Sequence, residues 1–130
     1  MAHPFQEVYD LVFKTSQTLG YDTVQSLPDP DNGQDLTRAF VHVGEQFGED
    51  IYNKSAIFGE VTQSIHVFGP IDNRLRVSSM MDSLIRKLRE QYSTPHYYIR
   101  ITQVRTQIIK DTSTAVTMWH GLLDVTFKIY

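Results

Sequence analysis

The sequence contains no cysteine and no long run of apolar residues. A chain without cysteine has no disulfide scaffold, no thiolate metal site and no cysteine nucleophile. None of its apolar runs approaches the roughly 18–20 residues that cross a bilayer. The start from Met1 to Phe5 also lacks the basic and apolar stretches of a secretion signal. We therefore expect a soluble protein that is made in a reducing cytoplasm and has no membrane partner.

A large excess of charge of one sign is also missing, because the formal net charge is −3. Residues 1–60 contain ten acidic and three basic side chains, a net of −7, and residues 61–130 contain five acidic and nine basic ones, a net of +4. This balance argues against a uniformly basic nucleic-acid-binding protein. If the two signs also separate in space, copies of the chain can associate head to tail. The alternative is that the charges separate along the sequence only.

The length of 130 residues and the mass of 15.0 kDa match one domain, because single cores usually take roughly 100–150 residues. The aromatic content of 12% is too high for a disordered tail. The sequence shows no internal repeat, no low-complexity tract and no linker. We expect residues 1–130 to form a single domain.

Two segments have the spacing of amphipathic helices. Pro4 suits the first position of a helix, apolar residues follow at helical spacing, and Gly20 offers the left-handed conformation that ends many helices. A second helix is predicted to begin after Asp72, a favourable N-cap, and to close at residues 93–95. Its apolar stripe comprises Leu75, Val77, Met80, Met81, Leu84, Ile85 and Leu88.

Strands are predicted at residues 21–27, 36–44, 59–68, 97–110 and 118–130. Within 97–110 the apolar positions change parity, so we expect a bulge or a bend near Thr102 and Gln103. The segment 28–33 is rich in proline, aspartate, asparagine and glycine, and is predicted to be a loop. The acidic segment from Glu45 to Ser55 is predicted to be a second loop.

The order of these elements predicts the fold class. Strand periodicity surrounds one well-capped central helix, so neighbouring strands are expected to pair antiparallel. The sequence therefore predicts an α+β fold, with one mainly antiparallel sheet of about five strands and two helices packed on one face.

The sequence carries no phosphate-cradling glycine loop, no paired-histidine zinc helix and no nucleophile elbow. His42, His66 and His120 fall in predicted strands. If these strands are neighbours, the three imidazoles and Asp124 approach one another on the open face of the sheet, where such groups bind metals or transfer protons. The alternative, favoured by the lack of any short-range ligand spacing, is three independent histidines. We predict no enzymatic activity and no cofactor.

Two further features indicate contacts with other protein surfaces. Arg74 and Arg76 stand in the first turn of the second helix, where cations oppose the helix dipole, so they suggest an acidic partner. The alternative is that both are solvated. The last strands carry apolar residues outside the core-facing set, namely Tyr98, Met118, Leu122 and Tyr130. With only two helices available, we expect another subunit to cover the second face of the sheet.

Three segments carry a resemblance to a known family: NKSAIFGEVTQSIHVFG (53–69), DNR (72–74) and WHGLLDVTFK (119–128). With the order of the predicted elements, they resemble the tail-component proteins of long-tailed (siphovirus) phages, in particular the tail terminator, or head–tail joining, family. The likeness extends over essentially the whole chain and is distributed over it rather than concentrated in one motif.

The resemblance implies a non-enzymatic structural protein of the virion. Members of this family form a ring, usually of six copies, that caps the finished tail tube and joins it to the head connector. The implied partners are therefore other copies of the chain, the tail tube protein and the connector or neck protein. Genome DNA passes through the bore without sequence-specific contact. The implied location is the head-proximal end of the tail, after synthesis in the cytoplasm of the host bacterium.

The charge pattern suggests how copies of the chain would meet. We expect acidic residues of one subunit to contact basic residues of the next, in a head-to-tail contact that closes into a ring. The candidate contact residues are Asp29, Asp31, Asp35, Glu45, Glu49, Asp50, Arg74, Arg76, Arg86 and Arg89.

Two other functions remain open at this point. The chain could be another neck, head-completion or minor tail protein of a phage, or a tail-tube relative. It could also be a small α+β ligand-binding protein or enzyme that dimerises through the open face of its sheet.

Overall fold

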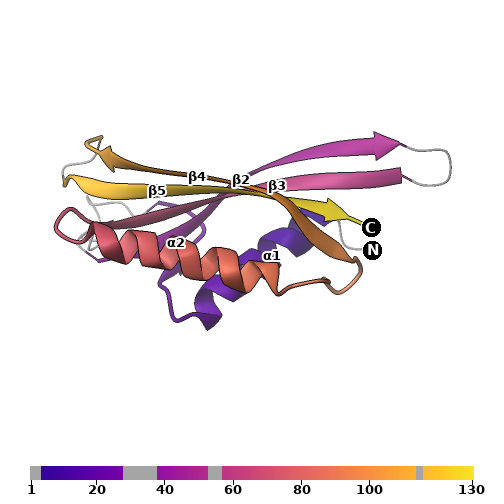
Figure 1. Ribbon diagram of the computed structural model, residues 1–130, viewed down its shortest axis with the longest axis horizontal. Coiled ribbons are helices and arrows are strands. Elements are labelled where there is room, and N and C mark those ends of the chain that lie inside the picture. The colour runs from indigo at the N-terminus through magenta and orange to yellow at the C-terminus, as the bar shows by residue number, and fades with distance from the viewer. Residues whose placement is uncertain (1–3, 28–37, 53–56, 114–115) are drawn as a thin grey trace.

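The computed structural model describes residues 4–27, 38–52, 57–113 and 116–130, without the side chains of residues 50–52 and 57–58. The elements are, in chain order (Figure 1), α1 (Pro4–Thr18), β1 (Thr23–Val24), β2 (Phe40–Tyr52), β3 (Ile57–Pro70), α2 (Arg74–Arg89), β4 (Ile99–Asp111) and β5 (Met118–Ile129). In the described part of the chain, neither helix has the length and apolar character needed to cross a bilayer.

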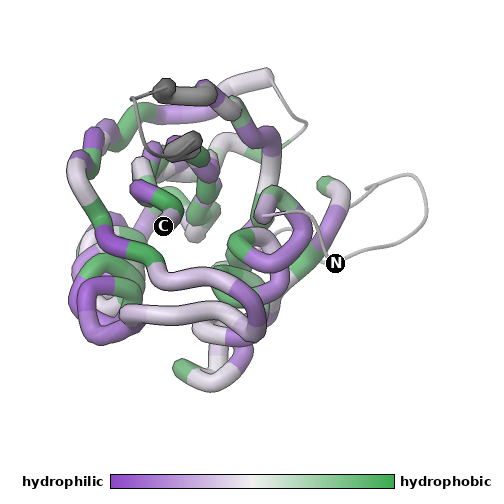
Figure 2. The backbone as a smooth tube through the Cα atoms, turned by 90° about the vertical axis from the view of Figure 1, so that its right-hand side faces the viewer, coloured by the Kyte–Doolittle hydropathy of each residue, from purple (hydrophilic) through white to green (hydrophobic). Residues whose placement is uncertain are grey.

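The strands form one sheet in the order β1-β2-β3-β5-β4. The short strand β1 pairs with β2 in parallel, and the other three pairs are antiparallel. Both helices lie on the same face of the sheet (Figure 1). Seen along the long axis of the molecule, each helix alternates between hydrophilic and hydrophobic stretches, as an amphipathic helix does (Figure 2). The predicted α+β fold is confirmed.

Each of the two outer long strands contains a β-bulge. In β4, the pairing with β5 shifts between Ile101 and Gln103, where the change of parity predicted it. In β2, the pairing with β3 shifts between Val43 and Gln46. An extra residue turns the following side chains over to the other face. The bulge in β4 therefore lets Val104 and Ile108 continue the core-facing set begun by Ile101.

The prediction of a loop from Glu45 to Ser55 is wrong for residues 45–52. This segment continues β2, and its pairing with β3 extends to Tyr52 opposite Ile57. The strand forms because β3 supplies partners for its backbone N–H and C=O groups, which outweighs the low strand propensity of glycine and acidic residues. The β2–β3 hairpin consequently extends beyond the helix layer at one end of the molecule (Figure 1).

Other element ends differ from the prediction by a few residues. The strand predicted at 21–27 is only Thr23–Val24, and in the described part of the strand predicted at 36–44, from residue 38 on, the strand begins at Phe40. The predicted loop 28–33 lies outside the described residues. As expected, Gly20 has a positive φ of 86° just beyond α1.

The start of α2 corrects another detail. The N-cap is Asn73 rather than Asp72, because the Asn73 side chain accepts a hydrogen bond of 3.1 Å from the backbone N–H of Arg76. The helix ends at Arg89, before the predicted closure at residues 93–95. Arg86, Lys87 and Arg89 occupy its last turn, where cations complement the helix dipole.

The core lies between the sheet and the helices, and two glycines set how closely α2 approaches. Val77 of α2 is fully buried. A Cβ on Gly69 of β3 would lie 2.4 Å from Val77 Cγ2, and a Cβ on Gly121 of β5 would lie 3.0 Å from Val77 Cγ1 and 2.4 Å from the sulfur of Met81. The two glycines thus form a notch in the sheet that receives Val77.

A buried carboxylate ties α1 to the loop between α2 and β4. Glu7 is only 5% exposed. Its carboxylate accepts hydrogen bonds from the hydroxyl of Thr94 (2.7 Å) and the backbone N–H of His96 (2.9 Å), and Nδ1 of His96 lies 2.7 Å from it. Burial raises the pKa of Glu7, but these hydrogen bonds and the nearby imidazole outweigh it, so that the net pKa lies below 4.5.

We predict that Gly121→Ala destabilises the protein by about 1–3 kcal/mol, because the added methyl group forces α2 away from the sheet. The free energy of unfolding from urea titration measures this effect. Gly59→Ala is a matched control, since a Cβ there would meet only the carbonyl oxygen of Glu49, 4.0 Å away. Equal loss of stability in both variants would contradict the notch.

We predict that Glu7→Gln lowers the urea midpoint at neutral pH and reduces its fall under acidic conditions. A carboxyl whose pKa is lowered by folding stabilises the native state above its unfolded pKa of about 4.5, and this stability is lost as the pH falls through the folded pKa. Glu49→Gln, an exposed substitution, serves as the control. Identical acid profiles for Glu7→Gln and the wild type would contradict the role of Glu7.

Candidate functional site

The face of the sheet that turns away from the helices, here called the open face, carries stacked aromatic rings at one end. Ring centroids are 5.0 Å apart for Phe40 and Phe68, and 4.4 Å apart for Phe68 and His120. Met118 was expected to need cover from another subunit, but it is buried against Phe40 and Phe68. These large rings within the chain already cover it.

The other apolar residues predicted outside the core are less buried. Tyr98 is 72% exposed and Tyr130 is 48% exposed. They lie together, because the backbone N–H of Tyr130 donates to the carbonyl of Tyr98 over 2.9 Å. Leu122 is half-buried on the open face.

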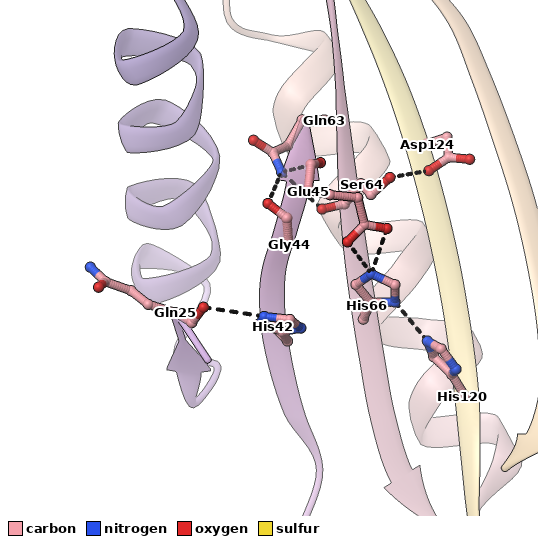
Figure 3. Close-up of polar contacts among 9 residues, drawn as sticks. All are labelled: Gln25, His42, Gly44, Glu45, Gln63, Ser64, His66, His120 and Asp124. Atoms are coloured by element: carbon pink, nitrogen blue, oxygen red, sulfur yellow. Dashed lines mark hydrogen bonds and ion pairs between the residues drawn. The ribbon is translucent and has the colours of Figure 1, made fainter. Parts of the chain in front are cut away.

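Three histidines from neighbouring strands meet on the open face and form what we call the histidine cluster: His42 of β2, His66 of β3 and His120 of β5 (Figure 3). Nδ1 of His66 lies 2.7 Å from Nε2 of His120. The ring centroids of His42 and His66 are 5.4 Å apart, and those of His66 and His120 are 5.0 Å apart. The strands are neighbours and the three imidazoles lie together, whereas the sequence analysis favoured three independent histidines. Asp124 instead accepts a hydrogen bond of 2.6 Å from Ser64.

The bulge in β2 aims a carboxylate at this cluster. Glu45 lies within the bulge, and its carboxylate is 3.2 Å from Nε2 of His66. Gln63 of β3 holds the bulge from the core side, since its amide donates to the carbonyls of Gly44 (3.0 Å) and Glu45 (3.2 Å). Gly44 is needed there, because a Cβ would lie 2.9 Å from the ring of His66. Bulges commonly redirect a side chain in this way.

The hydrogen bonds assign the tautomers of the neutral cluster. The Glu45 carboxylate only accepts, so Nε2 of His66 carries the hydrogen and Nδ1 of His66 is an acceptor. His120 therefore donates from Nε2. Likewise, Nε2 of His42 donates to the carbonyl of Gln25 over 3.2 Å. The result is a chain of hydrogen bonds from His120 through His66 to Glu45, which crosses from β5 to β2 (Figure 3).

Burial and the neighbouring imidazole of His66 lower the pKa of both His42 and His120 below the usual 6.5. Burial raises the pKa of Glu45, but hydrogen bonds from its own backbone N–H and from His66 outweigh this, and the net pKa lies below 4.5. Neutral imidazoles beside a carboxylate can exchange protons or ligate a metal. Among the described residues, however, no three histidine, aspartate or glutamate side chains are arranged to hold a metal ion.

The acidic contact candidates lie partly outside the described residues. Asp29, Asp31 and Asp35 are not described, and of Asp50 only the backbone in β2 is described. Glu45 and Glu49 do not stand in a loop, as the sequence suggested, but on the outer strand β2. The side chain of Glu45 is 54% exposed although it contacts His66.

The basic contact candidates already have contacts within the chain, with one exception. The guanidinium of Arg74 lies 5.4 Å from the ring centroid of Trp119, and that of Arg76 lies 5.5 Å from the ring of Tyr21. Arg86 forms an exposed ion pair with Asp82, one turn earlier in α2. For Arg89, which is exposed, the described part of the chain provides no ion-pair partner within 4.0 Å. Arg74 and Arg76 nevertheless remain exposed to solvent.

The two long edges of the sheet were not predicted from the sequence. In the part of the chain that the structure describes, β1 covers only residues 41–42 of β2, and β4 pairs with β5 on one side only. The described part of the β2 edge carries Glu45 and Glu49. The edge strand β4 carries Arg100, Arg105 and Lys110 against one acid, Asp111. The sequence does show these bases within one predicted strand, but not that this strand lies at an edge.

One cavity among the described residues has a volume of about 370 Å³ and is open to solvent. It lies where the β2–β3 hairpin leaves the helix layer. Its lining comprises Pro4, Phe5, Gly48, Glu49, Gly59, Glu60, Val61, Tyr97, Ile129 and Tyr130. The histidine cluster does not line it.

Comparison with known proteins identifies the fold. No family model matches the sequence, and no curated protein matches it significantly. Among solved structures, the chain is similar to a chain in a structure described as "Virion of native gene transfer agent (GTA) particle". The TM-score is 0.64 at 10% sequence identity, and the likeness covers 93% of this chain and 90% of that chain. The protein therefore shares its fold, over nearly its whole length, with a component of a virion particle.

Proposed function

We propose that this protein is a structural virion subunit, a tail terminator that forms a ring on the phage tail tube and joins it to the head connector. The observation that carries the proposal is the pair of long sheet edges of opposite charge. The shared fold with a virion component supports the virion setting. In this role the protein has no catalytic task. Its partners are other copies of itself, the tail tube protein and the connector or neck protein, and genome DNA passes through the bore without sequence-specific contact.

The uncovered edges provide the means of association. A strand at the edge of a sheet presents unpaired backbone N–H and C=O groups, which another strand can pair with. Among the described residues, no strand pairs with the β2 edge beyond the two residues covered by β1, and none pairs with the outer edge of β4 at the other side of the sheet. Because the two edges differ, a contact between β2 of one copy and β4 of the next is head to tail. Such a contact produces a ring when the rotation closes.

The charges on the two edges favour this pairing over its alternatives. Acidic Glu45 and Glu49 on β2 attract a basic strand, and two β2 edges repel each other. Arg100, Arg105 and Lys110 on β4 provide the basic partner. Helix α2 packs beside β4, and Arg74 lines a surface hollow together with Thr106 and Ile108 of β4. Arg76, in contrast, lies over Tyr21 on the β1 side of the molecule. We therefore propose that β4 and α2 together form the basic side of the contact.

Two alternatives lead to different outcomes. A neck, head-completion or minor tail protein with the same ring would join heads without controlling tail length. A dimeric ligand-binding protein would use the cavity beside Phe5 and bury its open face in a symmetric contact. Light scattering distinguishes the dimer, since a tight, pH-independent dimer with a ligand in that cavity would rule out the ring.

We predict that Arg100→Glu combined with Arg105→Glu leaves the fold intact and abolishes head–tail joining in extracts that lack the protein. Exposed charge changes usually alter stability by less than about 0.5 kcal/mol, whereas the reversed edge repels β2 of the next copy. Lys14→Glu combined with Arg38→Glu, two exposed positions on α1 and just before β2, changes the net charge equally away from the β4 edge and is the control. Joining at the wild-type level by the β4 variant would contradict the proposed contact.

A mixing experiment tests the head-to-tail geometry further. Glu49→Lys combined with Asp50→Lys reverses the charge on β2, and this variant on its own should also fail to join heads and tails. When the two defective proteins are mixed, each reversed edge can meet its complement in an alternating ring, so joining should recover in part. Failure of the mixture, with both proteins folded, would contradict pairing between β2 and β4.

We predict that phage particles assembled without this protein have overlong tails of variable length in electron micrographs. The reason is that the tail tube is a head-to-tail polymer, which continues to grow unless a closed ring caps it. Addition of the wild-type protein during assembly should restore uniform tails. Tails of normal length that merely lack heads would favour the neck or head-completion role instead.

A further inference from the structure

The histidine cluster brings three titratable rings closer together than three positive charges can readily lie. The ring centroids of His42, His66 and His120 are separated by 5.0–5.4 Å along the stack. The ring of Phe68 stacks on His120 at 4.4 Å and separates it from solvent on one side. The side chain of His66, in the middle of the cluster, is only 15% exposed. Like charges at such distances repel each other more strongly in a partly buried site than in water.

The hydrogen bonds limit how many protons the cluster can accept. In the neutral state, Nε2–H of His120 donates to Nδ1 of His66, and Nε2–H of His66 donates to Glu45. A first proton can bind to the outer nitrogen of His120 without breaking these bonds. A proton on Nδ1 of His66 would face the N–H of His120 at 2.7 Å, so it breaks the bond between β3 and β5.

The surrounding carboxylates offset the repulsion between protonated imidazoles only in part. On β2, the carboxylate of Glu45 contacts His66, and on β4, Asp111 acts on His120. On β5, Asp124 accepts a hydrogen bond from Ser64 and stands opposite Arg105 of β4. On the β1 side, the carbonyl of Gln25 accepts from His42. In the described part of the chain, two carboxylates therefore act on three imidazoles.

We propose that the histidine cluster is a pH-sensitive latch on the open face, which joins β2, β3 and β5 when it is neutral and loosens them when it takes up protons. The proposal concerns the isolated chain and does not depend on the virion role. It assigns the bulge in β2 a purpose, because the bulge places Glu45 on His66 and thereby sets the tautomers of the whole chain of hydrogen bonds.

The direction of the effect follows from the pKa values. The pKa of His42 and that of His120 lie below the unfolded value of 6.5. The unfolded chain therefore binds more protons than the folded chain as the pH falls through this value, and stability decreases toward acid. The stability that the neutral His42 and His120 contribute is fully present above about pH 7 and is lost progressively as the pH falls below it.

The test is the urea midpoint measured from about pH 7.5 to about pH 5.5, a range above the titration of Glu7. We expect the midpoint of the wild type to fall toward acid. His42→Phe combined with His120→Phe keeps two flat rings in the stack but removes two titrating groups, so most of this fall should disappear. Thr62→Val, which breaks the bond between Thr62 and Thr126 on the same face, is the control and should keep the wild-type slope.

Two results would overturn the latch. One is a pH slope that is the same in the wild type and in the double phenylalanine variant. The other is a marked rise of the midpoint with excess ZnCl₂ or NiCl₂ that His66→Phe abolishes, since the cluster would then be a metal site. If the double variant does not fold, NMR titration of the wild type decides: His42 and His120 titrating at or above 6.5 would refute the proposal.

Discussion

Backbone hydrogen bonding between the four long strands is the constraint on which the other features of this protein depend. Among the described strands, only β3 and β5 have neighbours on both sides along most of their length. Because these two strands lie in the middle of the sheet, they place the two glycines that receive Val77 in the core, and they hold His66 and His120 on the opposite face. Within the described part of the chain, β2 and β4 each have one side that is largely unpaired. Glu45 and Glu49 belong to β2, and Arg100, Arg105 and Lys110 belong to β4.

The sequence predicted the fold class because periodicity is a local property. The apolar stripe of α2, the alternation in β5 and the parity change near Gln103 each involve residues close in sequence. The extent of β2 could not be predicted in this way. Residues 45–52 have the composition of a loop, and they become a strand only because β3 pairs with them. That contact is not visible in either segment alone.

The candidate site was predicted in part for the same reason. The parity of His66 and His120 placed them on the open face, and the strand order then brought them together at 2.7 Å. The role of Glu45 depends on the bulge, which no local pattern in β2 indicated. Arg74 and Arg76 were recognised as unusual for the first turn of a helix, but their aromatic partners Trp119 and Tyr21 are distant in sequence.

The two β-bulges have a consequence for which strands can dock on this protein. Both lie on outer strands, and each adds one residue at which the strand bends and twists more strongly. A straight, extended segment from an unrelated or misfolded chain could hydrogen-bond to one half of either edge, but it would lose register at the bend. Such interruptions protect exposed edges against uncontrolled aggregation. Only a strand with a matching bend can remain paired along the full length of either edge.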